Sequence, residues 1–139
     1  MMQVERSIDI EDEVRKALDP YFNIYCRPLP KNFKLPSLLV TQTSGYDKNR
    51  IDNFNITIDS RAETETEALN LLLDATATLK EVAKHQLTQL SYAVINTCGS
   101  WGRDPVRPEL AMASAQLTVY THKVTKNIHK IVKENSYDA

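Results

Sequence analysis

The chain has 139 residues, of which 42% are hydrophobic and 25% are charged, and its formal net charge is −1. This length is typical of one domain with a self-sufficient core, and the near-neutral charge excludes a general attraction to nucleic acid or anionic lipid. The sequence has no apolar run of about 18 residues, as a membrane-spanning helix requires, and its acidic N-terminal residues lack the apolar core of a signal peptide.

Residues 7–18 are predicted to form the first helix. Its apolar residues recur at intervals of four, namely at Ile10, Val14 and Leu18. Acidic residues crowd the first turn and basic residues follow, which suits the helix dipole. Pro20 ends the helix, because proline disfavours the helical conformation at the residue before it.

A short strand and an extended connection are predicted next. Residues 21–26 alternate between two faces, which indicates a strand. Residues 27–36 contain three prolines and cannot form a regular ladder. We expect an extended segment there, anchored by Phe33 and Leu35.

Residues 37–42 and 53–59 are predicted to pair as an antiparallel hairpin. In the second strand three apolar residues alternate with polar ones, which is typical of a strand with one buried face. Residues 43–52 would then form an unusually long polar loop, since hairpin loops normally have about two to five residues. A loop of that length is either mobile or functional.

The longest helix is predicted from Thr64 to about residue 84 or 87. Thr64 and Glu67 fit a capping box, in which the threonine hydroxyl accepts from the amide three residues on. An apolar stripe at helical spacing should cover one face of the sheet. It consists of Leu71, Leu72, Ala75, Leu79, Val82 and Ala83.

The second half of the chain is predicted to hold a strand over residues 90–97, a loop over 98–107 and a long strand over 107–123. One face of the long strand carries small and branched apolar residues, which would let a helix approach the sheet closely. They are Ala111, Ala113, Ala115, Leu117 and Val119. Residues 124–139 are predicted to be a short helix or a loosely held tail outside the single domain of residues 1–123.

These elements predict an α+β fold. Its sheet is mixed but mainly antiparallel, has four to five strands, and is packed by one long helix and an N-terminal helix. The two cysteines, Cys26 and Cys98, are far apart, and this spacing favours reduced thiols in a cytosolic protein.

Searches for catalytic chemistry find no characteristic motif. The sequence has no Gly-rich phosphate loop, no HExxH, no GxSxG and no CxxC. We therefore expect no enzyme activity, no cofactor and no metal site. Asp104 and Arg107 flank prolines, and we interpret them as a structural corner that orients the last strand, with a buried ion pair or a ligand clamp as alternatives.

Candidate contact residues lie in the two polar loops. An aromatic residue among mixed charges is typical of a protein contact, and the alternative for the first loop is a merely flexible hairpin. The candidates are Tyr46, Asp47, Lys48 and Arg50 in the first loop, and Trp101, Arg103 and Arg107 in the second. The outward hairpin face is uncharged, and such a face can pair with another chain.

Two stretches carry a family resemblance, FNITIDSRAETETEAL over residues 54–69 and DPVRPELAMASAQLTVYTHK over residues 104–123. With the order of elements over about residues 8–123, they resemble the small tail terminator proteins of long-tailed bacteriophages, also described as tail completion or head–tail joining proteins. The most specific part is the Arg-Pro-Glu corner before the last long strand.

The resemblance implies a virion structural protein that assembles into a hexameric ring. The ring would cap the tail tube, end tail polymerisation and form the head–tail joining surface, without catalysis or a cofactor. Implied partners are further copies of the chain, the tail tube protein and a head–tail connector or head-completion protein. DNA would pass through without sequence-specific binding, and no membrane is involved. The protein would reside at the head-proximal end of the tail, and in the host cytoplasm during assembly.

Other functions stay open beside this one. The chain fits another phage head-completion or tail-tube component. It also fits a small cytosolic ligand-binding module or enzyme that uses the loop from Trp101 to Arg107 as a pocket. Single-stranded nucleic-acid binding is disfavoured, because the aromatic residues are not interleaved with basic ones.

Overall fold

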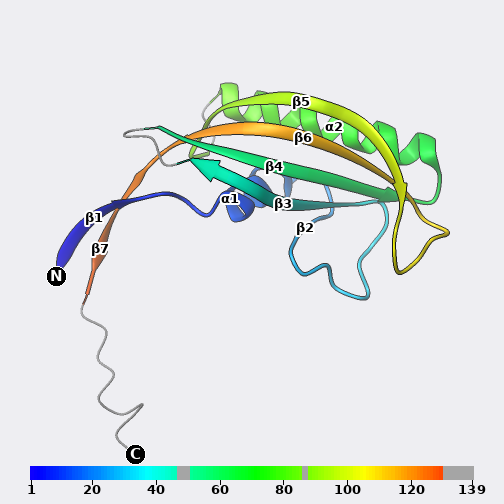
Figure 1. Ribbon diagram of the computed structural model, residues 1–139, viewed down its shortest axis with the longest axis horizontal. Coiled ribbons are helices and arrows are strands. Elements are labelled where there is room, and N and C mark those ends of the chain that lie inside the picture. Colours follow the sequence, from blue (N-terminus) through cyan, green and yellow to red (C-terminus); the bar gives the residue numbers. More distant parts are fainter. Residues whose placement is uncertain (47–50, 86–87, 130–139) are drawn as a thin grey trace, which may run out of the picture.

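The computed structural model describes residues 1–46, 51–85 and 88–129. The elements along the chain (Figure 1) are β1 (Met2–Arg6), α1 (Ile10–Leu18), β2 (Ile24–Cys26), β3 (Ser37–Tyr46), β4 (Ile51–Ala62), α2 (Glu65–Lys84), β5 (Leu90–Arg103), β6 (Ala111–His122) and β7 (Val124–Ile128).

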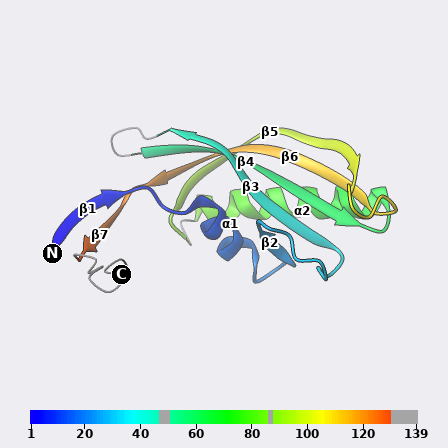
Figure 2. The same cartoon turned by 60° about the horizontal axis from the view of Figure 1, so that its bottom comes forward.

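A five-stranded sheet in the order β2-β3-β4-β6-β5 forms the body, and β1 and β7 form a separate two-stranded ribbon. Only β2 and β3 pair in parallel among these strands, and the other pairs are antiparallel. Both helices lie against one face of the five-stranded sheet (Figures 1 and 2). The predicted α+β fold, with its mixed but mainly antiparallel sheet, its long helix and its N-terminal helix, is confirmed.

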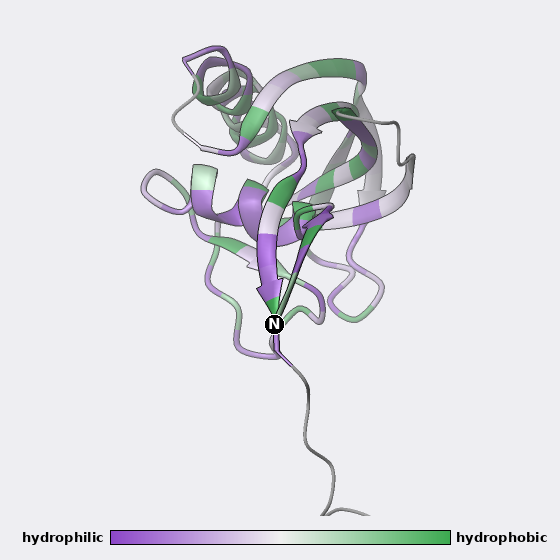
Figure 3. Cartoon of the chain, turned by 90° about the vertical axis from the view of Figure 1, so that its left-hand side faces the viewer, coloured by the Kyte–Doolittle hydropathy of each residue, from purple (hydrophilic) through white to green (hydrophobic). Residues whose placement is uncertain are grey.

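The core lies between α2, α1 and the covered face of the sheet. Alternate residues of β4 and β6 are buried, as the period of two predicts, and Figure 3 shows hydrophobic and hydrophilic residues alternating along the strands. The Ser60 hydroxyl donates to the carbonyl oxygen of Ala68 on α2 at 2.7 Å and lies 3.3 Å from that of Ala113 on β6. The predicted close approach of a helix to the alanine-rich strand is therefore confirmed.

Both helices begin after a capping side chain, of which the sequence predicted the one at α2. The Thr64 hydroxyl accepts from the Glu67 amide at 3.2 Å, so α2 begins where the capping box places it. In α1 the cap is Asp9, whose carboxylate accepts from the Asp12 amide at 3.3 Å. The first helix therefore begins at Ile10, three residues later than predicted.

The hairpin of β3 and β4 is longer than predicted. The strands extend to Tyr46 and from Ile51, so most of the predicted loop over residues 43–52 belongs to the ladder. A bulge between Gln42 and Ser44 shifts the register there. Polar residues suggested a loop because Ser44 and Gly45 are exposed and Asn53 and Asn55 are only half-buried at this end of the hairpin.

The strand β5 also extends beyond its prediction. Residues 98–103, predicted as part of a loop, pair with β6 up to the pair of Arg103 and Ala111. Gly99 has a φ of 98° and lies at a register shift between Cys98 and Ser100. Glycine adopts this backbone readily, so it marks a bulge rather than the end of the strand.

The chain termini form the ribbon that the sequence did not reveal. Residues 124–128 pair with Met2–Arg6 as an antiparallel strand, so the prediction of a helix or loose tail is wrong for them, while residues 130–139 lie outside the described ranges. The ribbon stands away from the body (Figures 1 and 3). Its two strands come from opposite ends of the chain, and no local pattern reports such pairing.

The Glu11 carboxylate joins α1 to the sheet and to the segment after β2. It accepts from the Gln42 amide at 3.0 Å and pairs with the guanidinium of Arg27. Burial raises the pKa of Glu11, but the hydrogen bonds from Arg27 and Gln42 and the charge of Arg27 outweigh it, and the pKa lies below its ordinary value of 4.5.

A glutamine at position 11 should therefore lower stability in a pH-dependent way. Because the folded pKa is lowered, the charged form contributes stability above about pH 4.5, and this is lost as pH falls. We expect Glu11→Gln to cost about 1 kcal/mol near neutral pH and much less near pH 3, in urea unfolding at both values. The exposed Glu63, changed to glutamine, is the control. An equal cost for Glu11→Gln at both pH values would contradict the assignment.

Candidate functional site

One group of predicted contact residues belongs to the tip of the β3–β4 hairpin. Tyr46 is the last residue of β3 and pairs with Asn53 of β4. Asp47, Lys48 and Arg50 lie outside the described residues. The role of this tip as a contact surface stays a prediction.

The other group lies at the opposite end of β4. Trp101 on β5 is 51% exposed and pairs with Ala113. Arg103 ends β5, and its guanidinium lies 3.6 Å from the carboxylate of Glu65 on α2. About 30 Å of strand separates this end from the hairpin tip. Tyr46 and the group of Trp101 and Arg103 therefore lie at opposite ends of the sheet.

The corner of residues 104–110, which joins β5 to β6, is organised by a buried carboxylate. One Asp104 oxygen accepts from the amides of Val106 at 2.9 Å and Arg107 at 3.5 Å, and the other accepts from Nε of Arg61 at 3.2 Å. The Arg61 and Asp104 side chains are only 8% and 5% exposed. The interpretation as a structural corner agrees with this geometry, although the buried partner of Asp104 is Arg61 and not Arg107.

Asp104 is held in its ionised form. Burial raises the pKa of Asp104, but the hydrogen bonds from the Val106 and Arg107 amides, together with the charge and hydrogen bond of Arg61, outweigh burial and lower it. The carboxylate therefore both closes the turn and compensates the buried guanidinium.

A pocket of about 500 Å³ opens beside this ion pair. One wall is the connection between β2 and β3, the other is the corner, and Arg61 joins them. The lining residues are Leu29, Pro30, Lys31, Phe33, Arg61, Asp104, Pro105, Val106 and Arg107. Trp101 and Arg103 lie on β5 outside this lining.

The two walls are held together by Phe33 and Arg107. Phe33 is 9% exposed, which confirms its predicted role as an anchor. The guanidinium carbon of Arg107 lies 5.5 Å from the centre of the Phe33 ring, a cation–π contact. Nε of Arg107 also lies 3.3 Å from the carboxylate of Glu109. Arg107 thus combines a structural contact with a place in the pocket wall.

Arg61, which lines the pocket, has a buried hydrogen-bond donor that the pair with Asp104 does not use. A guanidinium has five N–H donors, and its Nη1 is buried with no hydrogen-bond partner among the described residues. Leaving such a donor without an acceptor costs about 1–3 kcal/mol. Sequence reasoning missed Arg61, because it shares the outward side of β4 with Asp59, and only the folded connection over residues 27–36 covers it.

The open face of the sheet carries a chain of uncharged hydrogen bonds across four strands. Asn96 on β5 donates to Thr118 on β6 at 2.8 Å, and Thr118 donates to Asn55 on β4 at 2.9 Å. Asn55 in turn donates to Ser44 on β3 at 2.7 Å. This polar face is ordered by its own hydrogen bonds and has no charge along that line.

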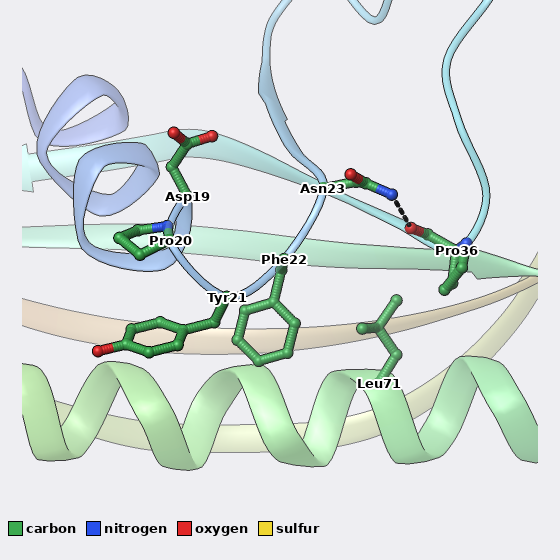
Figure 4. A pocket seen from close by; sticks show the side chains of 7 residues that line it. All are labelled: Asp19, Pro20, Tyr21, Phe22, Asn23, Pro36 and Leu71. Atoms are coloured by element: carbon green, nitrogen blue, oxygen red, sulfur yellow. Dashed lines mark hydrogen bonds between the residues drawn. The ribbon is translucent and has the colours of Figure 1, made fainter.

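A second hollow lies where the turn after α1 meets α2 (Figure 4). The side chains of Phe22 and Leu71 lie close to each other in it, and Asn23 donates to the carbonyl oxygen of Pro36 at 3.2 Å. Tyr21 is 63% exposed at its edge. The hollow brings together an apolar contact, one carboxylate, that of Asp19, and one phenol, that of Tyr21.

In the part of the chain that the structure describes, no three His, Cys, Asp or Glu side chains gather so that they can hold a metal ion. No helix there is long and apolar enough to cross a membrane.

Comparison with known proteins found neither a family model nor a curated protein sequence that matches this chain.

Proposed function

We propose that the protein is a virion assembly protein of a long-tailed bacteriophage. Copies of the chain would close into a hexameric ring at the head-proximal end of the tail. The ring caps the tail tube, ends its polymerisation and forms the surface that joins the head. The β1–β7 ribbon is the observation that carries this proposal. It projects from the body, and a neighbouring chain would cover its exposed apolar side chains.

The ribbon has little core of its own. Its exposed apolar side chains include Met2 at 62% and Ile128 at 37%, while Val124 packs against the main core at its base. A two-stranded ribbon alone is marginally stable in water, and three or more strands are needed for independent stability. Packing against a neighbouring subunit would cover these side chains and supply the missing strands.

The free edge of β5 offers a second, different surface. β5 lies at one edge of the sheet and runs for 14 residues, of which only Arg103 is charged. An uncharged edge strand is able to pair with a strand of another chain. A closed ring needs two different surfaces that meet from one subunit to the next, and the ribbon and the β5 edge meet that requirement.

The uncharged line across the open face of the sheet fits a subunit that acts by contact with other proteins. The hydrogen-bonded line from Asn96 to Ser44 presents donors and acceptors without net charge. The formal charge of −1 gives no general attraction to DNA passing through the ring. The tail tube protein and a head–tail connector or head-completion protein are the proposed partners of the two ring faces.

The ring is tested by light scattering and electron microscopy, with the protein alone and with purified tail tubes. We expect rings of six with a central channel that cap tube ends. Ile128→Lys and Met2→Lys should prevent ring formation while leaving the melting temperature unchanged, because they place a charge on the ribbon alone. Val106→Lys is the control, since Val106 is 86% exposed and lies in the corner.

A protein that stays monomeric and never binds tubes would overturn the proposal. Rings that stack without limiting tube length would indicate a tail-tube component, and rings that bind only heads would indicate a head-completion protein. A monomer that binds a metabolite would indicate the ligand-binding module, for which the pocket beside Arg61 is the supporting observation.

A further inference from the structure

The pocket beside Arg61 is not needed for a ring contact through the ribbon or β5. We propose that it is a binding site for a carboxylate carried on an apolar stem, from a free organic acid or from a polypeptide segment. This inference is independent of the ring, because its residues lie in the corner, in the connection before β3 and near the end of β4, and not on the ribbon or on β5.

The charges of the lining favour an anion. Lys31, Arg61 and Arg107 are cationic, and Asp104 is the one carboxylate among the nine lining residues. Asp104 is already engaged by Arg61 and by two backbone amides, so it offsets about one of the three positive charges. Glu109, which lies 3.3 Å from Arg107, offsets a second. The pocket therefore keeps a surplus of about one positive charge, that of Lys31.

The donors of Arg61 favour a carboxylate. Only Nε is bonded to Asp104, and Nη1 is buried without an acceptor among the described residues. A guanidinium fork matches the two oxygens of a carboxylate, and such charge-assisted hydrogen bonds are roughly twice as strong as neutral ones. An arriving carboxylate would supply the acceptors that this side chain lacks.

The rest of the wall favours an apolar stem over a small hydrated ion. Leu29, Pro30, Phe33, Pro105 and Val106 supply apolar surface opposite the guanidinium. A volume of about 500 Å³ lies within the range of small-molecule sites. An inorganic anion would leave this surface uncovered, whereas an aliphatic or aromatic stem would bury it.

Binding is measured by NMR titration of the full chain with phenylacetate and hexanoate, each compared with its amide. We expect the acids to shift the resonances of Phe33 and Val106, and to bind at least tenfold more tightly than phenylacetamide and hexanamide. Lys31→Ala should weaken acid binding severalfold, because Lys31 lines the pocket, whereas Lys34→Ala should not. Equal affinity for acid and amide, or equal effects of the two lysine variants, would overturn the proposal.

Two further variants distinguish a loss of binding from a loss of folding. Arg107→Ala should weaken phenylacetate binding, and unfolding measured in parallel shows whether the pocket persists. Arg61→Lys keeps the charge beside Asp104 but loses the fork, so it should reduce the preference for acid over amide.

The source of the carboxylate is distinguished by a short peptide that ends in phenylalanine, tested as the free acid and as the C-terminal amide. Tighter binding of the peptide acid than of phenylacetate assigns the site to a polypeptide segment. The reverse order assigns it to a free organic acid. Ring formation is measured separately, so a failure of either proposal leaves the other intact.

Discussion

Replacing Asp104 with alanine is expected to lower the free energy of unfolding by about 3–5 kcal/mol, which is the usual cost of breaking a buried ion pair. The change leaves the guanidinium of Arg61 buried without its counter-charge. It also removes the acceptor for the amides of Val106 and Arg107, so the corner before β6 loses its closure. Urea unfolding at neutral pH measures the effect.

The control is Glu109→Ala, because Glu109 forms an exposed ion pair with Arg107 in the same corner. Such a surface pair contributes about 1 kcal/mol at most. The double variant Arg61→Met with Asp104→Leu should recover the part of the loss that comes from the unpaired charge, since it removes both charges together. The part that comes from the Val106 and Arg107 amides should remain, because leucine accepts no hydrogen bond. A loss below about 1 kcal/mol for Asp104→Ala alone would show that water compensates the guanidinium and would contradict a dry ion pair.

Replacing Leu72 with alanine is expected to cost about 2–5 kcal/mol, from lost apolar burial and from the cavity that remains. Leu72 is fully buried on the side of α2 that faces the sheet. The close approach of α2 at Ala68 leaves little freedom for the helix to move inward and fill the space. Thermal and urea unfolding measure this change.

The neighbouring residue supplies a matched control. Leu73 has the same side chain on the same helix but is 46% exposed. Leu73→Ala should therefore cost well under half as much as Leu72→Ala, because it creates no closed cavity. Similar losses for both variants would mean that α2 is turned relative to its described position.

The predicted helices and strands were correct where a single pattern of neighbouring residues determines the element. The apolar positions of α1, α2, β4 and β6 were correct because each buries one face, and burial leaves a period of about 3.6 in a helix and two in a strand. The cap at Thr64 was predicted for the same reason, since its hydroxyl satisfies an amide only three residues away. The cap at Asp9 was missed, because the first helix was predicted to begin at residue 7.

The prediction errors concern strands whose residues are polar on both sides, or whose partner strand is distant in the sequence. Residues 98–103 and the ends of the hairpin looked like loops, because their side chains are exposed and only the ladder with a neighbour makes them strands. The ribbon escaped prediction because β1 and β7 are joined by tertiary pairing alone.

The residues of the candidate site were likewise predicted in part and missed in part. Asp104 and Arg107 were recognised as a corner from the adjacent prolines, and Phe33 as an anchor from its proline-rich surroundings. Arg61 was not recognised, because the alternation of β4 places it outward with Asp59. The pocket exists only where the connection over residues 27–36 folds over that outward side.

The sequence by itself determined the class of fold, the two helices, the cap of α2 and the buried faces of the central strands. These follow from short-range periodicity and from hydrogen bonds between close neighbours. Tertiary structure alone decided the ribbon, the full length of β5 and the partner of Asp104. Each depends on which distant backbone or side chain supplies the missing hydrogen bond or counter-charge, and no local pattern contains that information.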